Sequence, residues 1–253
     1  MDLQLKDRVV LVTGGSRGIG RAVVDGLAAE GARVAFCARG EEGVKAAEAE
    51  LTAAGADVAG SAVDVADGAA VATWVAESAE RFGQIDAVVA NVSALAIGPG
   101  EENWRSSFEV DLMHTVHLVE AALPHLERSD AASITAVSSV SGREIDFADG
   151  SYGVMKAALV HYVSGLAFDL APKGIRANAV SPGNVYFDGG VWQNVEQGDP
   201  AFFATALGLN PTGRMGNPTE TAYAVIMLVS PLASRISGTN LVADGALTRG
   251  VQL

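Results

Sequence analysis

A tyrosine and a lysine stand four residues apart in the segment SYGVMKAAL, which spans residues 151–159. If the segment is helical, Tyr152 and Lys156 share one face, because positions i and i+4 of a helix are neighbours. The pair is then either a packed phenol beside a solvated ammonium, or a proton donor whose pKa is lowered by the adjacent positive charge. The rest of the chain has to decide between these two interpretations.

A glycine-rich stretch, TGGSRGIG at residues 13–20, directly follows an apolar run and opens a helical pattern. This is the setting of a dinucleotide-binding turn, in which glycines allow a tight turn, close approach of a pyrophosphate and packing of the helix on the sheet. The free N–H groups and partial positive charge of the helix N-terminus favour phosphates. The residues that we expect to contact a cofactor here are Gly14, Ser16, Arg17, Gly18, Ile19 and Gly20.

The residues after the second apolar run indicate which nicotinamide cofactor is bound. NAD sites place an acidic residue at this strand tip, where it accepts a hydrogen bond from the ribose 2′-hydroxyl. The sequence CARGEE at 37–42 instead has Arg39 there, and Arg17 lies in the glycine-rich loop. Two arginines suit a 2′-phosphate, so NADP(H) is favoured over NAD(H). The alternative is that Arg39 is a solvated strand end and that Glu41 or Glu42 binds the ribose.

Short apolar runs alternate with amphipathic stretches along the chain. The predicted strands are 8–14, 33–39, 57–65, 86–92, 132–140, 175–183 and 239–244, and the predicted helices are 18–30, 41–54, 67–81, 103–128, 152–171 and 218–230. This alternation indicates an α/β fold with one Rossmann-type, doubly wound parallel sheet of about seven strands and helices on both faces. We expect a single domain over 1–253. Residues 184–216 lack strand character and predict an excursion over the sheet edge, near the strand ends where ligands bind.

Composition and charge argue against several classes of function. The net charge of −13 disfavours nucleic acid and anionic membranes as partners, because binding to either depends on Lys and Arg. No apolar run approaches the roughly 18 residues of a membrane span, and the N-terminus lacks a signal-peptide layout. The single cysteine, Cys37, excludes an internal disulfide and a multi-cysteine metal site. We therefore expect a cytoplasmic protein without a metal.

Together these motifs resemble those of the short-chain dehydrogenase/reductase family, in its NADP(H)-preferring type. The resemblance covers nearly the whole chain and rests on the order and spacing of TGGSRGIG, DVAD (64–67), SS (138–139), YGVMK, RANAVSPG (176–183) and GTNLVADG (238–245). Ser139 precedes Tyr152 by 13 residues, the usual spacing in the family. The resemblance implies an oxidoreductase that transfers a hydride between NADP(H) and a small ketone or secondary alcohol.

The resemblance also implies roles for individual residues. Tyr152 is the expected general acid/base, and Ser139 is expected to hydrogen-bond the substrate oxygen. Lys156 is expected to favour the phenolate and to bind the nicotinamide ribose. Asp111 stands where the family has an active-site asparagine. The further positions expected near the cofactor are Asp64, Val65, Asn91, Pro182, Gly183 and Val185.

Three departures from the family pattern bear on this site. The family's NNAG is ANVS at 90–93, so Ser93 replaces a glycine beside the cofactor. Asp111 accepts hydrogen bonds but, when ionised, cannot donate those of an asparagine. Phe187 stands where the family often has a threonine that contacts the cofactor. These departures leave open a weakly catalytic sensor or scaffold that binds the cofactor. A 3-oxoacyl carrier-protein reductase is the alternative among enzymes.

Two further expectations concern the 184–216 segment and assembly. The aromatic residues of the segment are Tyr186, Phe187, Trp192, Phe202 and Phe203. They either form a lid over bulky apolar substrates or only anchor the segment to the domain. The resemblance also implies a homotetramer, with interfaces formed by the helices at 103–128 and 152–171 and by the tail VQL at 251–253.

Overall fold

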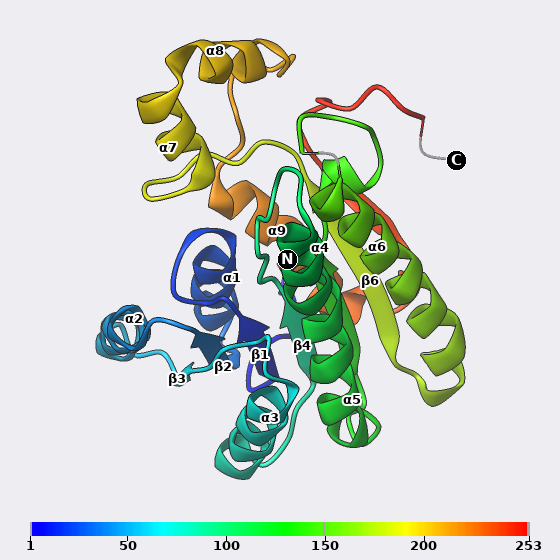
Figure 1. Cartoon of the computed structure of the whole chain (residues 1–253). Helices are drawn as coiled ribbons and strands as arrows, with labels where there is room; N and C mark the ends of the chain where they lie inside the picture. Colours follow the sequence, from blue (N-terminus) through cyan, green and yellow to red (C-terminus); the bar gives the residue numbers. More distant parts are fainter. Residues whose placement is uncertain (1, 149, 252–253) are drawn as a thin grey trace.

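The strands of the protein form one parallel sheet. The computed structural model describes residues 2–148 and 150–251. Within them the sheet has seven strands in the order β3-β2-β1-β4-β5-β6-β7, and neighbouring strands run parallel (Figure 1). The strands are β1 (Val9–Thr13), β2 (Arg33–Ala38), β3 (Val58–Ala62), β4 (Ala87–Ala90), β5 (Ser133–Val137), β6 (Arg176–Pro182) and β7 (Asn240–Ala243). The order reverses between β1 and β4, which places the topological switch point at the ends of these two strands.

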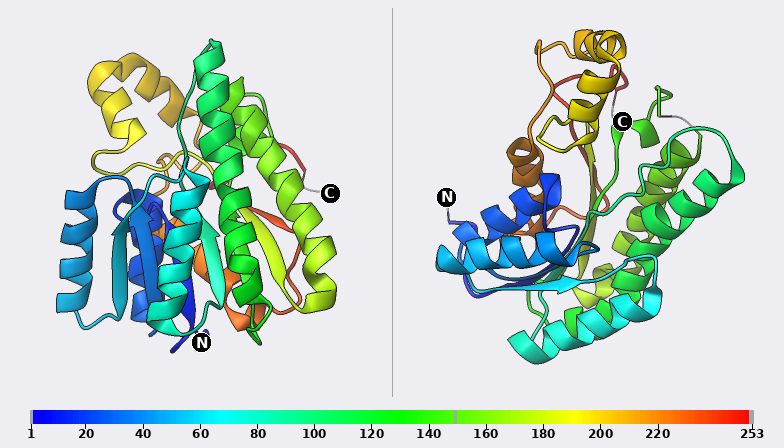
Figure 2. Two further views of the ribbon diagram at one scale, coloured as in Figure 1. Left: turned by 60° about the horizontal axis from the view of Figure 1, so that its bottom comes forward. Right: turned by 60° about the vertical axis from the view of Figure 1, so that its left-hand side comes forward.

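Helices cover both faces of the sheet (Figures 1 and 2). One layer is α1 (Gly18–Ala29), α2 (Glu41–Ala53) and α9 (Pro218–Val229), and the other is α3 (Gly68–Phe82), α5 (His114–Leu126) and α6 (Ser151–Leu170). Val9 and Leu11 of β1 pack with the second layer, whereas Val10 and Val12 pack with the first, because successive strand side chains point to opposite faces. The predicted doubly wound α/β fold is confirmed, and most predicted element ends lie within a few residues of the observed ones.

The predicted single helix over 103–128 is wrong in one respect. The chain there forms α4 (Glu101–Ser107), a π-helical segment η1 (Phe108–Met113) and then α5. A π turn takes more residues per turn than an α turn, so it changes which side chains face inward. Asp111, within η1, is only 1% exposed. Helical periodicity in the sequence does not reveal such a turn, because it assumes a constant 3.6-residue repeat.

The 184–216 segment, which has no predicted helix, contains α7 (Val191–Gly198) and α8 (Pro200–Gly208). Asp199 begins α8, and its carboxylate accepts a hydrogen bond from the Phe202 backbone N–H at 3.0 Å. Pro200 fits the first turn, where its missing N–H has no partner to lose. Both helices stand beyond the carboxyl ends of the strands (Figure 1). The remaining short helical turns are η2 (Val140–Gly142), η3 (Ala171–Lys173) and η4 (Pro231–Ala233).

Helix α6 contradicts the expectation that no segment is long and apolar enough to span a membrane. By length and composition, Ser151–Lys173 meets that description. One face of α6 packs against β6 and η2, as expected of a helix that covers a parallel sheet. The other face exposes Val154 and Phe168, the latter by 82%. The helix is therefore a core helix on one side and an apolar surface on the other.

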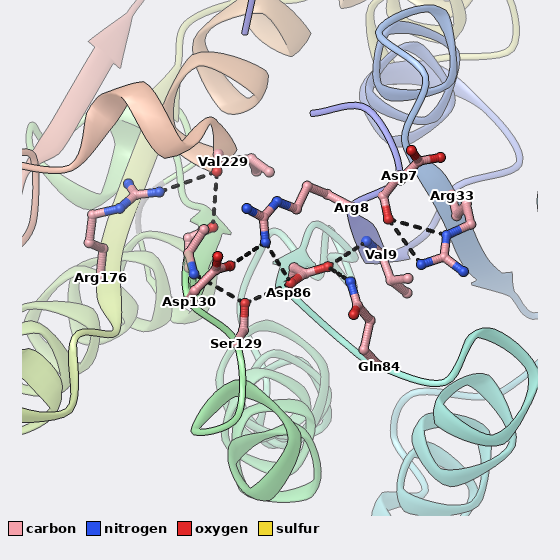
Figure 3. A network of polar contacts seen from close by, with 12 residues as sticks. Asp7, Arg8, Val9, Arg33, Gln84, Asp86, Ser129, Asp130, Arg176 and Val229 are labelled. Atoms are coloured by element: carbon pink, nitrogen blue, oxygen red, sulfur yellow. Dashed lines mark hydrogen bonds and ion pairs between the residues drawn. The ribbon is translucent and has the colours of Figure 1, made fainter. Parts of the chain in front are cut away.

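A polar network fastens the amino-terminal edge of the sheet (Figure 3). The Asp86 carboxylate, which is almost fully buried, accepts hydrogen bonds from the Val9 backbone N–H at 2.8 Å, the Gln84 amide at 2.6 Å and the Ser129 hydroxyl at 2.7 Å. Arg8 lies 3.3 Å from the same carboxylate. Asp86 thus connects the start of β1, the start of β4 and the loop that follows α5.

Replacing this carboxylate tests its structural role. Asp86→Ala leaves the buried Val9 N–H without an acceptor and removes a charged partner, so we expect the free energy of unfolding to fall by about 3 kcal/mol. Asp130 is the control, because it also pairs with Arg8 but its side chain is 80% exposed. Asp130→Ala should change the free energy of unfolding by less than about 1 kcal/mol. Urea denaturation measures both. Equal losses in the two variants would contradict the role assigned to Asp86.

Candidate active site

The glycine-rich loop joins β1 to α1 by a tight turn. Gly14 and Gly15 donate backbone hydrogen bonds to the Cys37 carbonyl at 2.7 and 3.1 Å, which hold the loop against β2. Gly18 has a φ of +57°, in the left-handed region that favours glycine. A Cβ at Gly20 would lie 2.1 Å from the Gly14 carbonyl oxygen, so α1 begins too close to the loop for any side chain. The turn therefore presents backbone N–H groups in a cradle that suits a pyrophosphate.

Both arginines of the predicted cofactor site are exposed at this edge of the sheet. Arg17 donates a long hydrogen bond of 3.4 Å to the carbonyl of Gly189. Neither Arg17 nor Arg39 pairs with a carboxylate within the described residues. Glu41, the alternative ribose ligand, instead pairs with Lys45 at 2.6 Å, one turn along α2. Two guanidinium groups therefore stand near the carboxyl end of β2 without an acidic partner in the described part of the chain.

The other residues predicted near the cofactor line the carboxyl ends of their strands. Asp64 is exposed and Val65 is buried, just after β3. The Asn91 amide donates to the Thr13 carbonyl at 3.1 Å, which fixes the chain after β4 to the glycine-rich loop. Pro182 ends β6. Gly183 follows, and it packs closely on Asp244: a Cβ added to Gly183 would lie 2.9 Å from the Asp244 Cβ. Val185 then forms a bridge to Gly216 at the base of the 184–216 segment.

His114 shapes this region as a packed, neutral residue. Its Nε2 lies 2.9 Å from the Thr13 hydroxyl and its Nδ1 lies 2.9 Å from the Val110 carbonyl. Burial, above all, lowers the His114 pKa to about 4. Thr13 in turn accepts a hydrogen bond from the Asn91 backbone N–H at 3.0 Å. The imidazole therefore supports the loop that carries Asn91.

Tyr152 and Lys156 lie on the buried face of α6. Lys156 is only 2% exposed, so the interpretation as a solvated lysine is wrong. Its ammonium donates to the Val137 carbonyl at 3.1 Å and lies 5.7 Å from the centre of the Tyr152 ring. Ser139 follows β5, and its hydroxyl acts on the Tyr152 phenol in the sense that lowers the pKa of that group. The structure thus brings together the three side chains that the sequence singled out.

Small residues make this approach possible. A Cβ at Gly142 would lie 2.7 Å from the Lys156 carbonyl carbon, and a Cβ at Gly153 would lie 2.8 Å from the Ser141 carbonyl oxygen. Each glycine therefore allows η2 to lie directly on α6. Ser138 adds a hydrogen bond of 2.8 Å from its hydroxyl to the Lys156 carbonyl. These contacts set the position of the β5–η2 junction, and with it Ser139, relative to the tyrosine.

Asp111 reaches the same centre from η1. Its Oδ1 lies 3.2 Å from the Lys156 ammonium, and both side chains are buried. Within the described residues, neither carboxylate oxygen has a hydrogen-bond partner. Burial of an ion pair is costly for each charge unless the other is present, so the two residues depend on each other. Asparagine in this position would leave the ammonium without that countercharge.

The pKa of Tyr152 is raised above its ordinary value, contrary to the lowering expected from its lysine neighbour. Burial has the largest effect, because it disfavours the phenolate. Lys156 and the Ser139 hydroxyl act in the opposite direction, whereas the negative charges of Asp111 and Asp146 raise the pKa further. Within the protein alone the tyrosine is therefore held as a phenol, the form that donates a proton.

Phe187 and Ser93, two of the departures from the family pattern, have defined places. The Phe187 ring packs on Gly18, where an added Cβ would lie 2.6 Å from the ring carbon Cζ. It covers the first turn of α1 with an apolar surface instead of a hydroxyl. The Ser93 hydroxyl accepts a hydrogen bond from the Leu95 backbone N–H at 3.0 Å, so it stabilises a local turn.

Aromatic side chains of the 184–216 segment pack against the loop before α6. Phe147 packs edge-on against Trp192 and Phe202, with ring centres 5.3 Å apart in both pairs. Trp192 of α7 is 8% exposed. The contact joins the 184–216 segment to the loop between η2 and α6. Sequence analysis missed Phe147, and only its place between Ser139 and Tyr152 in the chain pointed to the site.

Sequence analysis also missed two polar residues that adjoin Ser139. The Ser139 hydroxyl donates to the Ser141 hydroxyl at 3.2 Å, and the Ser141 hydroxyl donates to Asp146 Oδ2 at 2.7 Å. Asp146 is half-buried. The position of Ser141, two residues after Ser139, was the available signal. Within the described residues no cluster of three or more metal-ligating side chains occurs.

Known proteins share this sequence and architecture. The family model for enoyl-(acyl carrier protein) reductase matches residues 14–248. An isoepoxydon dehydrogenase, patN, from Penicillium expansum is 42% identical over 252 residues, covering 98% of this chain and 97% of the relative. The L-fucose dehydrogenase of Mus musculus is 35% identical over 251 residues, covering 96% and 89%.

A solved structure agrees with the sequence relatives. The NADPH-bound short chain oxidoreductase from Pseudomonas aeruginosa PAO1, which contains an atypical catalytic center, superposes with a TM-score of 0.91. It is 31% identical, and the alignment covers 97% of this chain and 98% of that protein. The match spans the glycine-rich loop, the residues on α6 and the last strand of the sheet. The chain therefore belongs to the short-chain dehydrogenase/reductase family of oxidoreductases.

Proposed function

We propose that the protein is an NADP(H)-dependent oxidoreductase that interconverts a ketone and a secondary alcohol, with Tyr152 as general acid/base. The observation that carries the proposal is the burial of Tyr152 and Lys156 side by side, next to Ser139. The whole chain, 1–253, acts as one catalytic domain. The 184–216 segment is its substrate lid.

The proposed chemistry assigns one task to each side chain. When bound, NADP(H) supplies or accepts the hydride. In ketone reduction Tyr152 donates its proton to the oxygen that gains negative charge, while Ser139 donates a hydrogen bond to the same oxygen. The Lys156 ammonium, 5.7 Å from the phenol ring, stabilises the phenolate that remains. Asp111 holds the ammonium in place through the ion pair at 3.2 Å.

The residues proposed to hold the cofactor are those at the strand ends. The loop glycines with Ser16 and Ile19 would hold the pyrophosphate, and the Tyr152–Lys156 pair would hold the nicotinamide ribose. Asp64, Val65 and Asn91 would hold the adenosine, and Pro182, Gly183 and Val185 would lie beside the nicotinamide. The fit rests on the cradle that any Cβ at Gly20 would fill and on two exposed arginines without acidic partners.

Cofactor preference tests the two arginines. Arg17 and Arg39 should make charge-assisted contacts to the 2′-phosphate, each worth roughly 1.5–3 kcal/mol, so NADPH should bind at least tenfold more tightly than NADH. Arg39→Ala should remove most of this preference. Arg105→Ala is the control, because Arg105 pairs with Glu101 on the exposed surface of α4. Calorimetric titration with both cofactors measures the preference, and equal binding by the wild type would refute it.

The acid/base assignment is tested by removing one hydroxyl. Tyr152→Phe keeps the packing of the ring, so folding and cofactor binding should survive while kcat falls about 10²–10⁴-fold. Ser139→Ala should lower kcat as well, because it loses a hydrogen bond that strengthens as the oxyanion forms. The assays use isoepoxydon, L-fucose and a panel of cyclic and linear ketones. A Tyr152→Phe enzyme as fast as wild type would disprove the assignment.

The pH dependence follows from the charges around Tyr152. Ketone reduction needs the phenol, so its rate should fall at alkaline pH as Tyr152 ionises. Asp111 raises the pKa of Tyr152, so Asp111→Asn should move this alkaline limb to lower pH. Alcohol oxidation needs the phenolate, and its rising limb should move in the same direction. Profiles of kcat against pH measure both limbs, and a shift to higher pH would contradict the account.

The proposed lid makes a claim about substrate size. Phe147, Trp192 and Phe202 form an apolar cover, so we propose fairly bulky, apolar carbonyl compounds as substrates. Trp192→Ala should raise KM for large ketones roughly tenfold and leave small ones unchanged. Trp104→Ala on α4, where the ring is 41% exposed, is the control. Unchanged KM values with a loss of stability would instead mean that the aromatics only anchor the segment.

Two other functions are less well supported. One is a 3-oxoacyl carrier-protein reductase: the matching family model is described as an enoyl-(acyl carrier protein) reductase, and a 3-oxoacyl-[acyl-carrier-protein] reductase from Vibrio cholerae is 31% identical. However, Lys173 is paired with Glu127, and Arg128 contacts His125 at 2.8 Å, so the basic residues for an acidic carrier are already engaged. A weakly catalytic sensor or scaffold would be favoured if wild type were inactive and Asp111→Asn restored turnover.

For assembly we propose a homotetramer of a cytoplasmic protein that does not bind membranes or nucleic acid. The exposed apolar face of α6, with Val154 and Phe168, is the surface proposed to meet a second copy. Of the tail VQL, only Val251 lies within the described residues, and it is 80% exposed. Residues 252–253 lie outside them.

A further inference from the structure

Asp146 places a carboxylate close to the residue that is proposed to bind the substrate oxygen. The Ser139 hydroxyl donates to the Ser141 hydroxyl at 3.2 Å, and the Ser141 hydroxyl donates to Asp146 Oδ2 at 2.7 Å. Asp146 therefore lies two hydrogen bonds away from Ser139. Its negative charge also raises the pKa of Tyr152, as expected of a carboxylate near the phenol. The carboxylate thus belongs to the surroundings of the reacting carbonyl group.

The Asp146 carboxylate keeps open acceptor positions. An ionised carboxylate has about four lone-pair sites. In the described part of the chain its oxygens accept one hydrogen bond each, from the Ser141 hydroxyl and, at 2.8 Å, from the Ala148 backbone N–H. No lysine, arginine or histidine in that part forms an ion pair with it. Because the side chain is half-buried and lacks a countercharge, a further hydrogen-bond donor would stabilise it.

The formation of a local turn explains only one of these contacts. The bond from the Ala148 N–H to Asp146 Oδ1 spans two residues, which is a common reason for an aspartate in a loop. It uses one carboxylate oxygen alone. The other oxygen, Oδ2, is directed to Ser141 and thus to the side of the loop on which Ser139 lies. The turn therefore does not account for the orientation of the carboxylate toward the site.

The next residue of the same loop is apolar and meets the 184–216 segment. The Phe147 ring packs edge-on against Trp192 and Phe202, with ring centres 5.3 Å apart in both pairs. The loop thus presents an acceptor near Ser139 and an aromatic ring toward the proposed lid. A ligand held between them would meet mostly apolar surface and one negatively charged acceptor. This combination suits a ring compound that carries a hydroxyl group.

We propose that Asp146 is a specificity-determining residue that accepts a hydrogen bond from a hydroxyl group of the substrate, so that the preferred substrates are cyclic hydroxy ketones and the diols formed from them. The proposal rests on the proposed function. An ionised carboxylate only accepts hydrogen bonds, so the substrate has to supply the donor. Because two hydrogen bonds separate Asp146 from Ser139, this hydroxyl stands a few carbon atoms from the carbonyl group. An analogue without it leaves the carboxylate unpaired and is disfavoured.

Three cyclohexanones with a hydroxyl, a methoxy or a methyl group on the ring carbon opposite the carbonyl test the proposal. Wild-type kcat/KM should be at least roughly tenfold higher for the hydroxyl compound, because it alone has a donor. Asp146→Ala should reduce this preference to less than about threefold. Glu144→Gln is the control and should keep it, since Glu144 lies on the same loop but accepts only from the Gly250 backbone N–H in the described part of the chain. A wild type that does not prefer the hydroxyl compound would overturn the proposal.

Asp146→Asn separates recognition of the substrate from support of the loop. The amide keeps an oxygen for the Ala148 N–H and gains N–H groups, which donate to an ether oxygen. We therefore expect the preference for the hydroxyl compound to fall, and kcat/KM of the methoxy compound relative to the methyl compound to rise roughly threefold or more. A purely structural role would lower kcat/KM by the same factor for all three ketones, and that result would overturn the proposal.

Binding of the corresponding alcohols distinguishes failure of this proposal from failure of the proposed function. NADPH-loaded enzyme does not oxidise alcohols, so ligand-observed NMR titrations measure binding of the diol and of the methyl-substituted cyclohexanol without turnover. The wild type should bind the diol roughly tenfold more tightly, and Asp146→Ala should bind both alike. If the wild type is inactive on every ketone, the proposed function fails, and the titration still decides on Asp146. Equal binding of the two alcohols by the wild type, or binding of neither, would overturn the proposal.

Discussion

The buried ammonium of Lys156 is the feature on which the arrangement of the site depends. A cation that is 2% exposed is stable only with partners, and it has two: the Val137 carbonyl at the end of β5 and the Asp111 carboxylate in η1. These partners come from different elements. They tie α6 to the end of β5 and to the π-helical segment η1, in which Asp111 faces inward. Tyr152, one helical turn before the lysine, is carried into the same buried layer.

Burial then decides the state of the tyrosine. The low dielectric that strengthens the pull of Lys156 also disfavours the phenolate, and the carboxylates of Asp111 and Asp146 act in the same sense as burial. The balance favours the phenol, which suits a proton donor. Close packing of η2 on α6 across Gly142 and Gly153 brings Ser139 to the phenol. The site is therefore defined as much by small residues as by its polar ones.

The fold and much of the site follow from local patterns in the sequence. Apolar runs and glycine spacing predict the sheet and the β1–α1 turn, and the four-residue spacing predicts that Tyr152 and Lys156 share a face. The π turn at Asp111 does not follow, because a constant helical repeat hides it. Helix α7 spans only eight residues, too short for a clear repeat, and α8 lacks a periodic pattern of apolar residues. Phe147, Ser141 and Asp146 act through contacts across a loop, which no local pattern encodes.

Direct titration of Tyr152 tests the coupling between the buried ammonium and the phenol. NMR of ¹³Cζ-labelled tyrosine follows its ionisation in the wild type and in Lys156→Met, with circular dichroism to verify folding. The account predicts that Tyr152 in the wild type titrates above the ordinary value of about 10, and higher still in Lys156→Met, because a favourable charge is lost. An ordinary pKa that does not respond to Lys156→Met would contradict it.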